Sequence, residues 1–226
     1  MWCIPELNEE YIQKMEDVLR MYQKAFNPNE PMIVIDEKPV QLLKETRKKK
    51  EANRPGKILK QDYEYKRCGT ANIFVCGEPK AGKYFARITK CKKFNEFAKT
   101  IITIEKKYKS AKKIHLIMDN LNTHREKSVI KYLGEKEGKK LWKRFNVHYT
   151  PKHGSWLNQA EIIIGILVRQ CLNGNRIPER KLLRKKVNTC LKRLSEKKMK
   201  IDWKFTVRKA RKKFRYKNSK YIGYQH

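Results

Sequence analysis

The chain has 226 residues, enough for one sizeable domain with extensions but not for several independent domains. Hydrophobic residues make up 39 % of it, so it can build a packed core and is not a wholly disordered chain. The 56 lysines and arginines against 23 acidic residues give a formal net charge of +33. Such an excess favours a polyanionic partner, first of all nucleic acid, over a membrane surface.

Two absences in the sequence support an intracellular protein. No apolar run is long enough to span a bilayer, and no signal peptide is visible at the amino terminus, so we expect no membrane partner. The six cysteines are scattered and form no C-x-x-C pair, and the five histidines have no zinc-type spacing. We therefore expect reduced thiols, no structural zinc and a cytoplasmic location.

The hydrophobic pattern predicts strands and helices in an alternating order. In chain order these are a helix over 7–26, a central strand over 32–35, a basic loop over 44–67, a hairpin of 71–76 with 84–89, a helix over 94–108, a strand over 114–118, a helix over 125–143, a strand over 145–149, a helix over 155–171 and a basic helical region beyond 178. Three meandering strands followed by two that are reached through helical crossovers predict an α/β fold, with a ribonuclease H-like mixed five-stranded sheet flanked by helices.

Two aspartates follow apolar strands directly. Asp36 comes after Met-Ile-Val-Ile and Asp119 after His-Leu-Ile-Met. If both strands are central and parallel, the two carboxylates meet at the carboxyl edge of the sheet, where α/β folds bind ligands. Two close carboxylates repel each other unless a cation lies between them, and Mg²⁺ is the hard ion that such oxygens prefer. A turn or cap role for a lone aspartate after a strand is the alternative.

Glu161 is the candidate for a third carboxylate, near the start of the helix after the last strand. Three carboxylates that hold two metal ions can activate a hydroxyl and stabilise the leaving oxygen of a phosphodiester. The alternative is structural, because Asn158 and Glu161 have the spacing of a capping box.

Three blocks of sequence closely resemble the three motifs of DDE transposases. They are residues 34–39 (VIDEKP), 118–124 (MDNLNTH) and 151–161 (PKHGSWLNQAE). They look most like the bacterial insertion-sequence branch of the mariner superfamily, and residues 65–72 (YKRCGTAN) and 202–206 (DWKFT) are also similar to that family. The resemblance therefore covers nearly the whole chain.

The resemblance implies a function and a site. Asp36, Asp119 and Glu161 would be the catalytic residues and would bind two Mg²⁺ or Mn²⁺ ions. Water would attack at the transposon ends, and the freed 3′ hydroxyl would then attack target DNA. The partners would be DNA and, in the synaptic complex, further copies of this chain, in the nucleoid of a bacterial cytoplasm. We divide the chain into a helical linker region (1–30), a ribonuclease H-like DDE catalytic domain (31–175) and a basic helical C-terminal extension (176–226).

The sequence departs from the family in two respects. Between Asp119 and Glu161 lie 41 residues, more than in the eukaryotic relatives, and we place the insert in the basic helical segment before Phe145. Members of the family also carry amino-terminal helix-turn-helix modules, and we recognise none before residue 30. We therefore expect a truncated copy, a catalytic fragment or one product of a split reading frame.

Polar residues beside the motifs are candidates for supporting roles. We expect Asn120 and Asn158 to hold the acidic residues by hydrogen bonds, as residues around metal ligands commonly do. His124 and His153 either hold a metal-bound water or a scissile phosphate, or are structural histidines. Trp156 either stacks on an unpaired base or anchors the core.

Basic residues are candidates for contacts with DNA phosphates, and a solvated charged surface is the alternative. The residues that we select are Arg47, Lys48, Lys49, Lys50, Lys152, Arg211, Lys212 and Lys213. The function predicted from all of this is a metal-dependent DNA transposase catalytic domain. Its rivals are an inactive DNA-binding remnant and a ribonuclease H-like nuclease.

Overall fold

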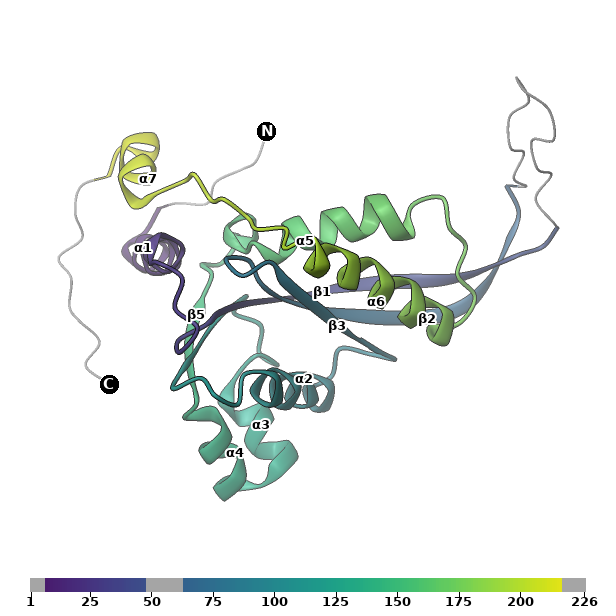
Figure 1. The fold of residues 1–226 in the computed structure, drawn as a ribbon, viewed down its shortest axis with the longest axis horizontal. Coiled ribbons are helices and arrows are strands. Elements are labelled where there is room, and N and C mark those ends of the chain that lie inside the picture. The colour runs from purple at the N-terminus through teal and green to yellow at the C-terminus, as the bar shows by residue number, and fades with distance from the viewer. Residues whose placement is uncertain (1–6, 48–62, 217–226) are drawn as a thin grey trace.

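The computed structural model describes residues 7–47 and 63–216. Its centre is a five-stranded sheet in the order β3-β2-β1-β4-β5 (Figure 1). The strands are β1 (Met32–Glu45), β2 (Tyr65–Glu78), β3 (Lys83–Thr89), β4 (Ile114–Met118) and β5 (Phe145–Tyr149). The first three strands pair antiparallel, whereas β4 runs parallel to both β1 and β5. The predicted ribonuclease H-like mixed sheet is thereby confirmed.

Helices cover both faces of this sheet (Figure 1). One face carries α5 (Ala160–Leu167) and α6 (Arg180–Glu196), and the other carries α2 (Phe94–Lys107), α3 (Glu126–Leu133) and α4 (Glu135–Trp142). Alternation along the strands produces the two cores, since successive side chains of a strand point to opposite faces. On β1, Val34 packs into the core on the face with α5 and α6, which we call the first core. Ile33 and Ile35 pack into the second core, on the face with α2.

The segments that flank the sheet complete the first core. Helix α1 (Glu9–Gln23) lies along β5 and near α7 (Val207–Phe214). It contributes Met15, Val18 and Leu19, which are fully buried, to the same core that contains Leu183 of α6. The division of the chain into linker, catalytic domain and extension stays a prediction, and α1 and α6 share one core with α5.

The central strand is longer than the sequence pattern predicts. It does not end at Asp36 but continues to Glu45, because β1 pairs with β2 from Val34↔Gly77 to Glu45↔Tyr65. These backbone bonds to β2 hold an outer stretch of β1 that has few apolar side chains. The predicted basic loop over 44–67 is therefore wrong at both of its ends, and its middle, 48–62, lies outside the described residues.

Two predicted helices are interrupted. The helix expected over 125–143 is split into α3 and α4 at Gly134, whose φ of +85° is in the region that favours glycine. The helix expected over 155–171 consists of a 3₁₀ turn η1 (Ser155–Leu157), then α5, then a π turn η2 (Val168–Leu172). The break before α5 places Asn158 in an extended conformation. No described helix combines the length and the apolar character needed to cross a membrane.

Candidate active site

The parallel pairing of β1 and β4 positions the two aspartates. Met32, Ile33 and Val34 lie opposite His115, Leu116 and Ile117. Extending this register by two residues brings Asp36 level with Asp119, which directly follows β4. Asp36 has the same parity as Val34, so it belongs to the face of the sheet that α5 covers. Glu161 is in the first turn of α5.

Asn158 ties this turn to Asp36. Its Nδ2 donates hydrogen bonds to Oδ2 of Asp36 (3.2 Å) and to the carbonyl oxygen of Ile35 (2.9 Å). Its Oδ1 accepts a hydrogen bond from the backbone N–H of Ala160 (3.1 Å). The expected contact between Asn158 and an acidic residue is therefore present. The capping box is not, because the residue that caps α5 is Gln159, whose side chain makes no capping hydrogen bond.

Burial and the neighbouring carboxylates both act on the Asp36 carboxyl. Burial raises the pKa of the Asp36 carboxyl, and the backbone N–H of Glu37, at 2.8 Å from Oδ1, partly opposes this. The negative charges of Glu161, Asp119 and Glu37 raise the pKa further, to about 7. Four carboxylates from β1, the end of β4 and α5 thus share one electrostatic environment.

This environment suits a divalent cation in its chemistry. Carboxylate oxygens are the ligands that Mg²⁺ and Mn²⁺ prefer, and a cation would offset the repulsion that raises the pKa of Asp36. Within the described ranges, however, no three His, Cys, Asp or Glu side chains are grouped closely enough to hold a metal ion. The residue types therefore suit a divalent cation, and their side chains would have to move closer together to coordinate it.

His124 joins two acidic residues of the site. Its Nδ1 lies 2.5 Å from Oδ1 of Asp119, and its Nε2 lies 2.9 Å from Oε1 of Glu37. Its ring stacks on Phe97 with 4.7 Å between centroids, and it is 1 % exposed. Burial alone lowers the pKa of His124, but the hydrogen bonds to Asp119 and Glu37 outweigh burial and raise it to about 9. A buried imidazolium thus orients Asp119.

Glu37 is the site residue that sequence reasoning missed. It stands next to Asp36 in the first motif, and that adjacency is the only signal the sequence offers. Its side chain alternates to the face opposite Asp36, where it meets His124 across 87 residues of chain.

The other two candidates for supporting roles lie in a groove beside Asp119. Asn120 accepts a hydrogen bond from Arg125 (3.3 Å), and His153 has a φ of +61° in the turn after β5. Both line a groove of about 750 Å³ that also contains Asp119, Lys152 and the start of α1. No hydrogen bond joins Asn120 or His153 to an acidic residue of the site among the bonds of the described residues.

Trp156 packs in an aromatic cluster. Its ring lies 5.6 Å from that of Phe205 and 6.3 Å from that of Phe214, against the first core. Of the two roles considered for Trp156, these contacts agree with the core anchor.

The basic residues proposed as DNA contacts differ in their surroundings. Arg211 of α7 is bound to the buried Glu16 of α1, with Nε–Oε1 at 2.7 Å and Nη2–Oε2 at 2.9 Å. Lys213 lies over the rings of Phe205 and Phe214. Lys48, Lys49 and Lys50 lie outside the described residues. The phosphate contacts of these residues, and those of Arg47, Lys152 and Lys212, stay predictions.

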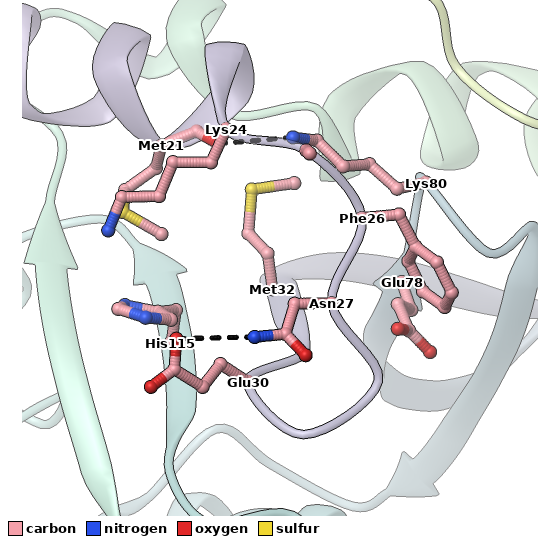
Figure 2. Close-up of a pocket in the computed structure, with 10 residues that line it drawn as sticks. Met21, Lys24, Phe26, Asn27, Glu30, Met32, Glu78, Lys80 and His115 are labelled. Atoms are coloured by element: carbon pink, nitrogen blue, oxygen red, sulfur yellow. Dashed lines mark hydrogen bonds between the residues drawn. The ribbon is translucent and has the colours of Figure 1, made fainter.

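A second, smaller pocket lies at the opposite edge of the parallel strands (Figure 2). It has a volume of about 40 Å³, and Met32 at the start of β1 and His115 of β4 line it. Nδ1 of His115 lies 3.0 Å from Nε2 of His148. Nδ1 of His148 lies in turn 2.7 Å from Oδ2 of Asp17. Burial, together with the neighbouring His148 and Lys24, lowers the pKa of His115 to about 4. Of these three polar groups only His115 is buried, and they lie at the other end of the parallel strands from the carboxylates of the candidate active site.

Comparisons with solved structures agree on the fold. The chain is similar to the Mos1 mariner paired-end complex with Mn (TM-score 0.53, 15 % identity, 88 % of this chain and 63 % of that chain). It is also similar to the Mos1 strand transfer complex (TM-score 0.54, 15 % identity, 88 % and 62 %) and to a pre-cleavage Mos1 transpososome (TM-score 0.53, 14 % identity, 90 % and 67 %). This chain thus spans less than two thirds of the length of the first of these relatives.

Comparison at the level of sequence assigns the family. A search of the curated proteins gives no match. The model of the DDE superfamily endonuclease family matches residues 31–184, which include Asp36, Asp119, Glu161 and every described strand. The chain therefore belongs to the DDE superfamily endonucleases.

Proposed function

We propose that this chain is the catalytic part of a metal-dependent DNA transposase, which nicks transposon ends and joins the freed 3′ hydroxyl to target DNA. The observation that carries the proposal is geometric: the β1–β4 register brings Asp36 level with Asp119, and Asn158 ties Asp36 to the turn that leads to Glu161. The Mos1 structures of similar fold are complexes with transposon ends and a strand transfer complex, which supports DNA as the partner. The bacterial insertion-sequence branch and the homo-oligomer stay predictions.

The three carboxylates are the proposed ligands of two Mg²⁺ or Mn²⁺ ions, and one relative of similar fold was solved with Mn. Bound there, the ions would activate the attacking hydroxyl and stabilise the leaving oxygen. Asn158 would keep Oδ2 of Asp36 turned toward Glu161, and His124 would hold Asp119. Because its pKa is about 7, Asp36 must release a proton to bind a cation near neutral pH.

The groove beside Asp119 suits a phosphodiester strand. Lys152 places a cation in its lining, and Asn120, His153 and Ser155 add polar groups; Lys14, a second cation there, pairs with Glu10 of the same lining (2.6 Å). We propose that the strand to be cut lies in this groove, with its phosphates near the lysines and the scissile phosphate near Asp119.

A cleavage assay tests the proposal. Wild-type protein with Mg²⁺ or Mn²⁺ should nick duplex DNA that carries the transposon ends and join the 3′ end to a second duplex. Asp119→Asn should abolish nicking while DNA affinity stays the same or rises, since one negative charge is lost. Glu135→Gln is the control, because Glu135 is an exposed residue of α4 that pairs with Lys139. Nicking that persists in Asp119→Asn would contradict the assignment of the site.

The inactive DNA-binding remnant is the second candidate, and the absence of a closely grouped metal cluster among the described residues favours it. A remnant would bind DNA with the same salt dependence but would not nick with any divalent metal, even when a partner protein supplies the helix-turn-helix modules. Affinity should fall by about 10³ or more between 50 and 200 mM salt for an enzyme and a remnant alike, if six or more phosphates are neutralised. Nicking without joining would indicate a nuclease of the same fold.

A further inference from the structure

Tyr22, near the end of α1, lies beneath the turn that leads to Glu161. Its hydroxyl donates a hydrogen bond to the carbonyl oxygen of Leu157 (2.7 Å) and accepts one from the backbone N–H of Gln159 (3.2 Å). The side chain is 7 % exposed, and its ring lies 5.3 Å from that of Trp203. Burial raises the pKa of Tyr22, so its hydroxyl keeps the proton that it donates.

The two backbone groups that Tyr22 binds are at a break between helices. The 3₁₀ turn η1 ends at Leu157, and α5 begins at Ala160, so neither helix binds these two groups. In a buried position, backbone groups without a partner are costly. A single hydroxyl from α1 satisfies both of them, although 135 residues separate Tyr22 from Leu157.

The same turn is held from its other side by Asp36. Asn158, between the two residues that Tyr22 binds, donates to Oδ2 of Asp36, and Glu161 follows three residues later. The backbone N–H of Glu161 also bonds to the carbonyl oxygen of Asn158 (3.0 Å). The position of this turn therefore decides both how Asp36 is oriented and where α5 presents Glu161.

We propose that Tyr22 is a positioning residue for the metal site, which holds the 157–159 turn so that Asp36 and Glu161 face each other. The inference rests on the proposed function only in taking divalent metal ions as the ligand of those carboxylates. It assigns α1, which lies outside the matched family region, a part in building the site.

The test compares Tyr22→Phe with Tyr84→Phe. Both changes keep the ring and remove a hydroxyl that donates to a backbone carbonyl in the same core, since Tyr84 donates to Met199 (2.5 Å). Both variants of the full chain should fold, which circular dichroism checks. Amide hydrogen exchange without metal should become at least tenfold faster at residues 159–161 in Tyr22→Phe and stay unchanged there in Tyr84→Phe.

Calorimetric titration with Mn²⁺ provides the second readout. Affinity should fall about three- to tenfold in Tyr22→Phe and stay at the wild-type value in Tyr84→Phe. Unchanged exchange at 159–161, or equal effects of the two variants, would overturn the positioning role. If exchange rises as expected but wild-type protein binds no Mn²⁺, the metal site of the proposed function fails while the role of Tyr22 in holding the turn stands.

Discussion

The Nε2 atom of His124 lies 2.9 Å from Oε1 of Glu37, and this contact joins the loop after β4 to the face of β1 opposite Asp36. The other ring nitrogen reaches Asp119, so one imidazole ring contacts two carboxylates. With a pKa of about 9, the ring is protonated at neutral pH and donates at both nitrogens. Asp119 is thereby oriented before any metal binds.

Glu37→Gln should lower the pKa of His124, because it removes one of the two carboxylates that raise it. A folded-state pKa above the unfolded value stabilises the protein fully below about 6.5, and this stability is lost as the pH rises through about 9. In Glu37→Gln the loss should still begin near 6.5 but should be smaller and complete at a lower pH. Titration of the His124 ring by NMR measures the shift, with Glu135→Gln as the control. An unchanged His124 titration would contradict the assigned contact.

Asp36→Asn should stabilise the protein in the absence of metal while it abolishes nicking. The pKa of Asp36 rises from 3.8 to about 7 on folding, so its contribution to stability is lost as the pH rises between these values. At pH 8 the amide should therefore increase the free energy of unfolding by about 1–4 kcal/mol. Urea unfolding at pH 4 and pH 8 measures the difference, which should be small at pH 4. A gain of equal size at both pH values would argue against electrostatic repulsion as the cause.

Stability should fall at acid pH because of His115. Its pKa is lowered to about 4, so protons bind more readily to the unfolded chain, and stability is lost as the pH falls from about 6.5 through about 4. His115→Gln, which can still donate to His148 but does not titrate, should reduce this loss by about 1–3 kcal/mol. Urea unfolding across that pH range measures it. An acid loss of the same size in His115→Gln and in the wild-type protein would contradict this role of His115.

Glu16→Gln should loosen the contact between α7 and α1. The Glu16 carboxylate is 1 % exposed and accepts bonds from Arg211 and, through Oε1, from the Tyr216 hydroxyl (3.1 Å). Replacing a charged acceptor of two or more bonds should cost about 1–3 kcal/mol in the free energy of unfolding. Hydrogen exchange should rise first in α7. In this variant Arg211 would also become free to bind phosphate. Unchanged protection of α7 would show that its packing does not depend on Glu16.

Much of the sheet could be predicted, because the apolar runs that mark its strands are formed by neighbouring residues in the sequence. The apolar runs 32–35 and 114–118 and the hairpin 71–76 with 84–89 correspond to strands in the structure. The continuation of β1 past Asp36 could not be predicted, because residues 36–45 include Pro39 and several polar side chains and depend on pairing with β2. The break before α5 could not be predicted either, since the partner of the freed backbone groups is Tyr22 of α1.

The sequence by itself determined the alternating order of helices and strands and the positions of Asp36, Asp119 and Glu161 within their motifs. It also determined the large positive charge, which favours a polyanionic partner. Hydrophobic periodicity and motif spacing are properties of neighbouring residues, so they can be read along the chain. Only the tertiary structure decided that Glu37 meets His124, that Tyr22 supports the turn before Glu161, and that Arg211 binds Glu16. These contacts join residues 87 to 195 positions apart, and which side chains meet over such separations depends on how the helices pack on the sheet.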